Sequence, residues 1–222
     1  MPCITLNSYD LQSSITPGDA EIGVGISVER DMPVDFYYYN SYSGTMLFAS
    51  QLSAIPTGAT IDRIEYKYEI LTNGVYDRIG VDMYMYQVDA TYSAFPTNTL
   101  VNGTSSSDTT YNSLITNSKQ TLTNSSYDFT KVSGDPNITF RGINLANPYT
   151  NFDNTKNLVI IFNQASGYYV PNSQSYPRVK GTTLNNGGTC YFNYRDGGGA
   201  YALTDTATIE TGFMPIIKLF WS

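Results

Sequence analysis

The sequence predicts an all-β protein built as an antiparallel β-sandwich, and three observations favour this class. Charged residues make up only 14% of the 222 residues, against roughly 25% in a typical soluble domain. Their place is taken largely by Ser, Thr, Asn and Tyr, and both Thr and Tyr suit pleated, half-buried surfaces. Several stretches alternate between apolar and polar residues, whereas no segment keeps a helical period over several turns.

The length fits a single sandwich domain over residues 1–222. Residues 1–20 are expected to form an N-terminal arm or strand. The polar, low-complexity stretch at 103–126 predicts a loop, a weak hairpin or an insertion between two halves of the sandwich.

The first informative stretch is PVDFYYYNSYSGTMLFASQL at 33–52. Its second half, TMLFASQL, predicts a core strand. In the first half, successive side chains of a strand alternate, so Tyr37 and Tyr39 cannot share a face with Tyr38. A sandwich is expected to have one core, so one face of this run should meet solvent or another chain.

Tyrosine-rich segments are therefore the candidate binding sites, at Tyr37, Tyr39 and Tyr42 and at Tyr168 and Tyr169 in a second loop. Tyrosine combines a large apolar ring with a polar tip, which suits both interfaces and sugar stacking. Three interpretations stay open for the first run, namely contact with a partner or subunit, glycan binding, and ordinary packing beneath a loop. The second loop, at 166–179, is either a recognition surface or a solvated connection.

Two alternating runs predict neighbouring strands at 63–71 and 79–88, and the intervening TNG at 72–74 is a turn signal. We expect them to form an antiparallel hairpin with a longish connection. The side chains expected on the buried faces are Ile64, Tyr66, Tyr68 and Ile70 in the first strand and Ile79, Val81, Met83 and Met85 in the second.

The later strands are expected at 157–163, 189–195 and 213–221. The segment NLVIIFN at 157–163 is apolar on both faces, which predicts a central strand covered on both sides. Pro215 cannot donate to a ladder, so it should lie at an edge, a bulge or a strand start.

The residue inventory argues against catalysis. The chain has no His, which removes the commonest general base and every His-containing zinc site. No acidic residue sits in a recognisable catalytic frame, so we expect no enzyme; a carbohydrate-active enzyme is kept only as a third alternative. Cys3 and Cys190 either pair or are two separate thiols, and the sequence leaves both readings open.

No cofactor is predicted. The segments at 151–157 and 194–199 contain the oxygen-bearing residues that Ca²⁺ needs. Neither has the spacing of a known calcium loop, so an Asx-turn is the preferred interpretation and Ca²⁺ is the alternative.

The charge pattern excludes two classes of partner. The net charge is −7 and the Lys and Arg residues are scattered, so neither nucleic acid nor an anionic membrane is expected to bind. The longest apolar run, at 158–162, is too short to insert across a bilayer. The first residues lack the pattern of a secretory signal, so we expect either a removed signal or release by lysis.

Six segments follow one another in a recognisable order. They are EIGVGISVERDMP at 21–33, YSGTMLFASQL at 42–52, IPTGATIDRIEYKY at 55–68, VDMYMYQVDATYSAF at 81–95, NPYTNFDNTKNLVIIFNQASGYY at 147–169 and CYFNYRD at 190–196. This order resembles a jelly-roll-like β-sandwich domain of Bacteroidetes-type surface and secreted proteins and of phages infecting such bacteria. The resemblance implies a structural or adhesive role and carries over no catalytic residue. The bacterial copies sit in long chains with a signal and a sorting tail, which are not seen here.

These observations predict a non-enzymatic structural and adhesive protein. The favoured version is a phage virion surface subunit, such as a head decoration, fibre or tail-associated protein. The alternative is a secreted or cell-surface bacterial adhesin that binds glycan. Other virion or surface subunits are the expected partners, in a homo-oligomer or larger assembly.

Overall fold

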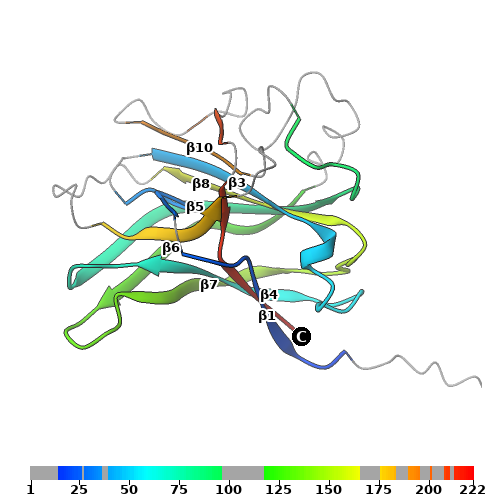
Figure 1. Cartoon of the computed structure of the whole chain (residues 1–222), viewed down its shortest axis with the longest axis horizontal. Helices are drawn as coiled ribbons and strands as arrows, with labels where there is room; N and C mark the ends of the chain where they lie inside the picture. Colours follow the sequence, from blue (N-terminus) through cyan, green and yellow to red (C-terminus); the bar gives the residue numbers. More distant parts are fainter. Residues whose placement is uncertain are drawn as a thin grey trace, which may run out of the picture.

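The computed structural model describes residues 15–26, 28–36, 40–96, 118–165, 176–183, 190–195, 201, 208–210 and 213–222. These residues form two antiparallel sheets packed face to face, so the predicted all-β sandwich is confirmed. Figure 1 shows the sheets as two layers, with β10, β3 and β8 in one layer and β7, β4 and β1 in the other.

The first sheet, sheet I, has seven strands. They are β1 (Gly18–Ile22), β2 (Val28–Arg30), β4 (Ile61–Glu69), β7 (Ile138–Tyr149), β9 (Arg178–Thr183), β12 (Phe213–Pro215) and β13 (Ile217–Trp221). The order is β1-β13-β4-β9-β12, while β7 pairs with β4 and β2 pairs with β9.

The second sheet, sheet II, has six strands in the order β11-β10-β3-β8-β5-β6. They are β3 (Asn40–Leu47), β5 (Gly74–Val88), β6 (Lys119–Lys131), β8 (Asn157–Ala165), β10 (Cys190–Arg195) and β11 (Thr208–Glu210). A single 3₁₀ turn, η1 (Ala49–Gln51), follows β3 in the described part of the chain.

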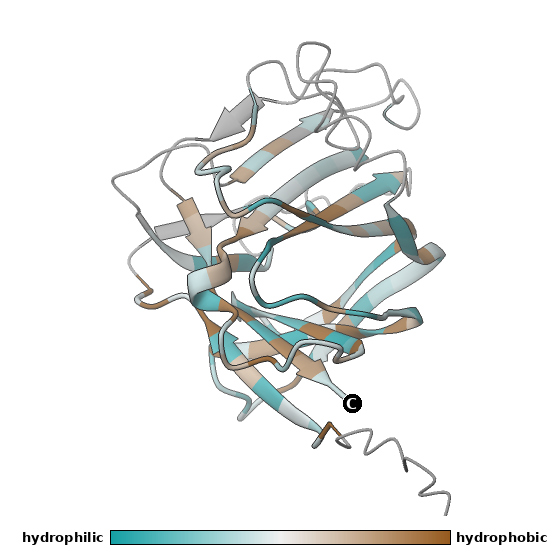
Figure 2. Ribbon diagram, turned by 90° about the vertical axis from the view of Figure 1, so that its right-hand side faces the viewer, coloured by the Kyte–Doolittle hydropathy of each residue, from teal (hydrophilic) through white to brown (hydrophobic). Residues whose placement is uncertain are grey.

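The alternation in β4 determines which face of sheet I is buried. Ile64, Tyr66, Tyr68 and Ile70 are fully buried, whereas the intervening charged residues are only partly covered. Strands of both sheets alternate between hydrophobic and hydrophilic residues in Figure 2. The core between the sheets therefore follows directly from the period-two pattern.

The predicted hairpin between 63–71 and 79–88 is wrong. β4 pairs with β7, β13 and β9 in sheet I, while β5 pairs with β6 and β8 in sheet II. Each strand has one strongly apolar face, and the two faces meet across the core instead of lying side by side. The turn between the strands therefore crosses from one layer to the other.

The predicted alternation of β5 holds only after a bulge. The register with β6 shifts between Arg78 and Val81, and Gly80 has a φ of +65°. Before the bulge Tyr76 and Arg78 point inward, and Ile79 is 53% exposed. The placement of Ile79 on the buried face is therefore wrong, because the extra residue changes the phase of the strand.

Strand β8 lies at the centre of sheet II, between β3 and β5, and is covered on both faces as predicted. Leu158, Ile160 and Phe162 face the core between the sheets. Val159 and Ile161 belong to a separate buried cluster on the other face of the sheet.

That separate cluster, the outer core, shows that the expectation of one core per sandwich is wrong for this chain. It consists of Tyr42, Met46, Tyr86, Val88, Phe95, Val159, Ile161, Tyr191 and Tyr201. Every residue of β3 is buried, because both faces of that strand are covered by other parts of the chain. The core strand predicted within TMLFASQL ends at Leu47, and the 3₁₀ turn follows.

Three further expectations meet the structure in part. Residues 119–126 of the predicted polar loop belong to β6, because β6 pairs with β5 along a bulged ladder; residues 103–117 lie outside the described residues. Residues 18–22 form β1, and 1–14 are likewise outside. Pro215 ends β12, the edge strand in the order of sheet I, so its predicted edge position is confirmed.

Two adjacent residues test whether β8, at the centre of sheet II, is buried on both faces. Ile160→Ala and Ile161→Ala should each reduce the free energy of unfolding by about 2–5 kcal/mol, because each truncation leaves a cavity in a separate buried cluster. Urea denaturation followed by circular dichroism measures the change, with exposed Thr130→Ala as the control. A loss under about 0.5 kcal/mol for Ile161→Ala would contradict a buried outer face.

Candidate functional site

The predicted site residue Tyr42 lies inside the protein. It has no exposed surface, and its ring stacks on Tyr191 with centroids 5.5 Å apart. The two hydroxyl oxygens are 3.2 Å apart. A Cβ at Gly44 would collide with the Tyr191 ring, so the glycine makes room for this stack. The structure therefore assigns Tyr42 to the packing of the outer core.

The other four predicted site residues, Tyr37, Tyr39, Tyr168 and Tyr169, lie outside the described residues, and their contacts stay a prediction. The structure does describe the residues on either side of the first run, 37–39. Phe36 and Asn40 are 1% and 3% exposed. The run of three tyrosines is therefore bounded on both sides by buried residues.

A buried arginine holds the segment before this run. Arg78 donates from Nε to the Asp35 carbonyl oxygen at 2.8 Å and from a terminal nitrogen to the Phe36 carbonyl oxygen. Its guanidinium also lies over the Phe36 ring, 5.3 Å from the centroid. Burial lowers the pKa of Arg78, while Asp35 and Asp77 act in the opposite direction.

Hydroxyl groups of β3 complete this polar cluster. The Asp35 amide donates to Ser41 Oγ at 2.9 Å, and Ser41 Oγ donates to Gln164 Oε1 at 2.7 Å. Ser43 Oγ donates to the Pro33 carbonyl oxygen at 2.6 Å. This cluster was not predicted from the sequence, because the bulge that turns Arg78 inward leaves no clear signal in the residue pattern.

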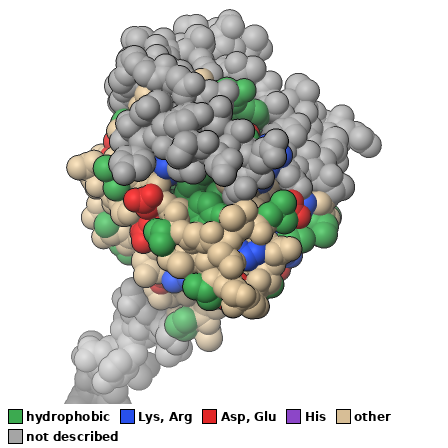
Figure 3. All heavy atoms as spheres, turned by 90° about the vertical axis from the view of Figure 1, so that its left-hand side faces the viewer, with side chains coloured by type: hydrophobic (Ala, Val, Ile, Leu, Met, Phe, Trp, Pro, Cys, Tyr) green, Lys and Arg blue, Asp and Glu red, His purple; other side chains and the backbone are tan. Residues whose placement is uncertain are grey.

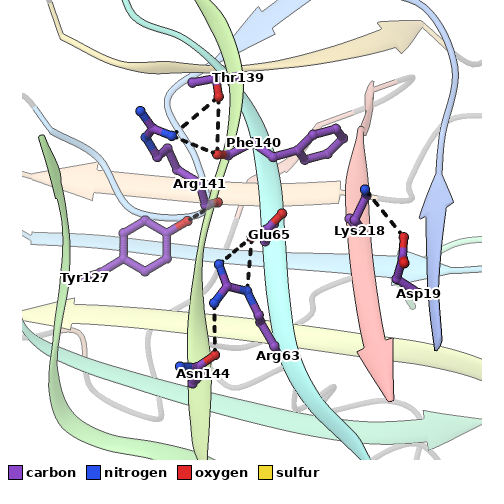
Figure 4. A network of polar contacts seen from close by, with 9 residues as sticks. All are labelled: Asp19, Arg63, Glu65, Tyr127, Thr139, Phe140, Arg141, Asn144 and Lys218. Carbon is purple, nitrogen blue, oxygen red and sulfur yellow. Dashed lines mark hydrogen bonds and ion pairs between the residues drawn. The ribbon is translucent and has the colours of Figure 1, made fainter. Parts of the chain in front are cut away.

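The outer face of sheet I carries a cluster of charged and aromatic side chains, shown in part in Figure 4. We call it the charged face, and it consists of Asp19, Glu21, Arg63, Glu65, Lys67, Phe140, Lys218 and Phe220. These residues come from the adjacent strands β1, β13, β4 and β7. Their side chains point away from the core because they alternate with buried neighbours.

Opposite charges on this face lie within contact distance. Lys218 Nζ is 3.4 Å from Asp19 Oδ2 and Lys67 Nζ is 3.1 Å from Glu21 Oε1. Arg63 reaches Glu65 at 2.5 Å within β4 and also donates to Asn144 Oδ1 at 3.1 Å. Each carboxylate of the face therefore has a cationic neighbour.

The two phenylalanine rings are covered by these cations. Lys67 and Lys218 lie 5.0 and 5.2 Å from the centroid of Phe140. Arg63 lies 5.5 Å from the centroid of Phe220. Such contacts contribute roughly 0.5–1 kcal/mol each at exposed sites. The rings and charges of this face therefore contribute little to the free energy of unfolding.

Gly142 allows β7 to approach this face closely. It pairs with Glu65, and a Cβ there would collide with the Ile64 carbonyl oxygen and the Glu65 Cα. Any side chain at this position would push β7 away from β4. The glycine therefore keeps the face continuous from β1 to β7.

Exposed hydrophobic side chains at one end of the sandwich form no comparable surface. Leu71, Val75 and Val132, at the turns β4–β5 and β6–β7, are 61%, 72% and 56% exposed. Figure 3 shows the left-hand end of the molecule, where hydrophobic side chains lie singly or in small groups between polar ones. Scattered exposure of this kind is normal for a soluble domain.

Of the two segments considered for calcium, the structure describes 151–157 in full and 194–199 only in part. Asp153 Oδ1 accepts from the Thr155 amide at 3.0 Å and from Thr155 Oγ1 at 2.6 Å. These bonds lower the pKa of Asp153, and they form an Asx-type turn. Only Tyr194 and Arg195 of 194–199 are described. No group of three or more His, Cys, Asp or Glu is placed to hold a metal ion among the described residues.

The cysteine question stays open. Cys190 is buried, and its Sγ lies 3.5 Å from Thr45 Oγ1. Cys3 lies outside the described residues.

Comparisons with protein-family models, with curated proteins and with solved structures found no match to this chain. Within the described part of the chain, no helix has the length and hydrophobicity that crossing a bilayer requires.

Replacing the buried arginine should destabilise the fold strongly. Arg78→Met should reduce the free energy of unfolding by roughly 3–5 kcal/mol, because the Asp35 and Phe36 carbonyls lose their buried donor. Arg63→Met, on the charged face, is the matched control and should stay within about 1 kcal/mol. Equal losses in urea denaturation would show that Arg78 has no special structural role.

Buried tyrosines should make the protein sensitive to alkali. Burial is the main cause that raises the pKa of Tyr66, Tyr68 and Tyr127 above their ordinary value. The unfolded chain therefore releases these protons first, so stability is fully present below about pH 10 and is lost progressively above it. Tyrosinate absorbance should rise together with unfolding, and normal titration of these residues in the folded protein would contradict the prediction.

Proposed function

We propose that this protein is a non-enzymatic structural and adhesive subunit of a phage virion surface, such as a head decoration, fibre or tail-associated protein. The observation that supports this proposal is the charged face. The outer core covers the outer face of sheet II at β3, β8 and the end of β5, whereas sheet I presents a row of rings and charges to the outside.

The charged face suits contact with other subunits. Aromatic rings and Arg are enriched at protein interfaces, and Phe140, Phe220 and Arg63 lie together here. Paired charges give orientation and partner choice more than affinity. Repetition of one subunit over a particle would multiply such weak contacts.

The chemistry of the described residues favours binding over catalysis. The whole chain lacks His, and hydrogen bonds hold the pKa of Asp153 below its usual range. A general acid needs the opposite shift.

A secreted or cell-surface adhesin is the second candidate, because the resemblance over residues 21–196 also covers bacterial surface domains. In both cases the partners are further subunits, including copies of this chain, and a surface glycan. The two candidates differ in location, on the virion or on the outside of the cell.

A double variant tests the charged face. Lys67→Ser with Lys218→Ser should leave the fold intact, because exposed ion pairs contribute about 0–1 kcal/mol each, yet weaken attachment to purified particles about tenfold. Lys119→Ser with Arg178→Ser loses the same charge at residues outside the charged face and the cleft, and is the control. Particle sedimentation with immunoblotting measures attachment, and a thermal melt checks folding.

Absence of the wild-type protein from purified particles would contradict the virion assignment. Equal attachment of both double variants would show that the charged face is not the contact surface.

A further inference from the structure

A cleft of about 400 Å³ opens where the chain passes from sheet I to sheet II. It lies between the end of β5 and the loop 150–156, which joins β7 to β8. This loop is at the right-hand end of the molecule in Figure 1, the end that faces the viewer in Figure 2. The volume falls within the range of about 300–1,000 Å³ in which small ligands bind.

The loop that forms one wall is anchored to the body of the protein. Phe152 is fully buried; its amide donates to the Ala59 carbonyl oxygen at 3.2 Å, and its own carbonyl accepts from Gly58 at 2.6 Å. Thr57 Oγ1 donates to Asn154 Oδ1 at 2.9 Å. A wall held in this way is preformed, so a ligand would not have to order it.

A side chain of β5 fixes the polar part of the cleft. Gln87 Nε2 donates to the Asp153 carbonyl oxygen at 2.6 Å, and the Asp153 amide donates to Gln87 Oε1 at 2.9 Å. The Gln87 amide thus pairs with the backbone of Asp153 through both of its polar atoms. The carboxylate of Asp153 is held at the cleft, with Lys156 Nζ 3.5 Å from Oδ2.

Two further residues give the cleft an aromatic and an amide group. Tyr149 is half-buried, and burial raises the pKa of Tyr149 to about 12. Its hydroxyl therefore stays protonated at neutral pH and can both donate and accept. Asn151 is exposed at the cleft and has a φ of +59°, a left-handed conformation that Asn tolerates better than most residues.

We propose that this cleft binds a neutral sugar, with Tyr149 contacting the apolar face of the ring and Asn151 and Asp153 binding its hydroxyls. A ring face, an amide and a carboxylate together match a ligand that presents C–H groups on one side and hydroxyls at its rim. Asp153 and Lys156 compensate each other's charge, so the cleft offers no net charge to select a phosphate or an acidic sugar. Tyr42, the predicted site tyrosine that the structure describes, is not among the residues that line this cleft.

The test uses an array of neutral and sialylated oligosaccharides, followed by titration calorimetry with the oligosaccharides bound by the wild-type protein. Asn151→Gly removes the amide and keeps the left-handed backbone, which glycine adopts freely. Tyr149→Ala removes the ring. Each change should weaken binding of a neutral oligosaccharide by about tenfold. Tyr194→Ala removes a 40% exposed ring on β10 and should leave binding unchanged.

Thermal melts accompany every variant, and Asn151→Gly should melt as the wild type does. If Tyr149→Ala fails to fold, Asn151→Gly still decides the outcome. Three results would overturn the site: no neutral oligosaccharide bound by the wild-type protein, binding unchanged in Asn151→Gly, or binding of sialylated oligosaccharides alone. Sugar binding that persists without particle attachment would count against the virion proposal and leave this cleft in place.

Discussion

The burial of both faces of β8 is the constraint on which the rest of the structure depends. A strand that is apolar on both sides must have a layer on each side, because each exposed face would leave large side chains in water. Sheet I covers one face. The outer core covers the other, and it draws in Phe95 and Tyr201 from outside the strands of sheet II. β3, which lies beside β8, is likewise buried on both faces, and the end of β5 contributes Tyr86 and Val88 to the outer core.

This constraint also limits where the protein can meet a partner. The centre of sheet II is closed on both faces, and its open surface includes the outer side of β5 and β6, where Val75 pairs with Thr130. Sheet I presents the charged face, where β4 places Arg63, Glu65 and Lys67 opposite the core. Strand β6 is an edge strand of sheet II, and register shifts interrupt its pairing with β5. Such bulges discourage strand addition, so contact through side chains of the charged face fits this fold better than edge pairing.

The sequence predicted what depends on local pattern and failed where the answer depends on distant neighbours. Alternation in β4 and the doubly apolar run of β8 were read correctly, because period and hydrophobicity are properties of the segment itself. The hairpin was wrong because the partner of a strand is chosen by the whole sheet. Ile79 was misplaced because one inserted residue reverses the phase of β5. Tyr42 was expected as a contact residue because nothing near it in the sequence shows the stack with Tyr191, 149 residues away.

The candidate sites also divide into features that the local sequence predicts and features that depend on distant neighbours. The alternation in β4 predicted its buried side chains and so leaves its charged residues on the opposite face, but their partners on β1, β13 and β7 depend on register. The segment 151–157 was noted for its oxygen-bearing side chains, and three of its residues line the cleft. What the sequence could not show is that Gln87 would reach across 66 positions to pair with the Asp153 backbone. That pairing exists because β5 lies beside β8 in sheet II while β7 leads in from sheet I. The connection from β7 in one layer to β8 in the other therefore leaves an anchored opening lined by polar groups at one end of the sandwich.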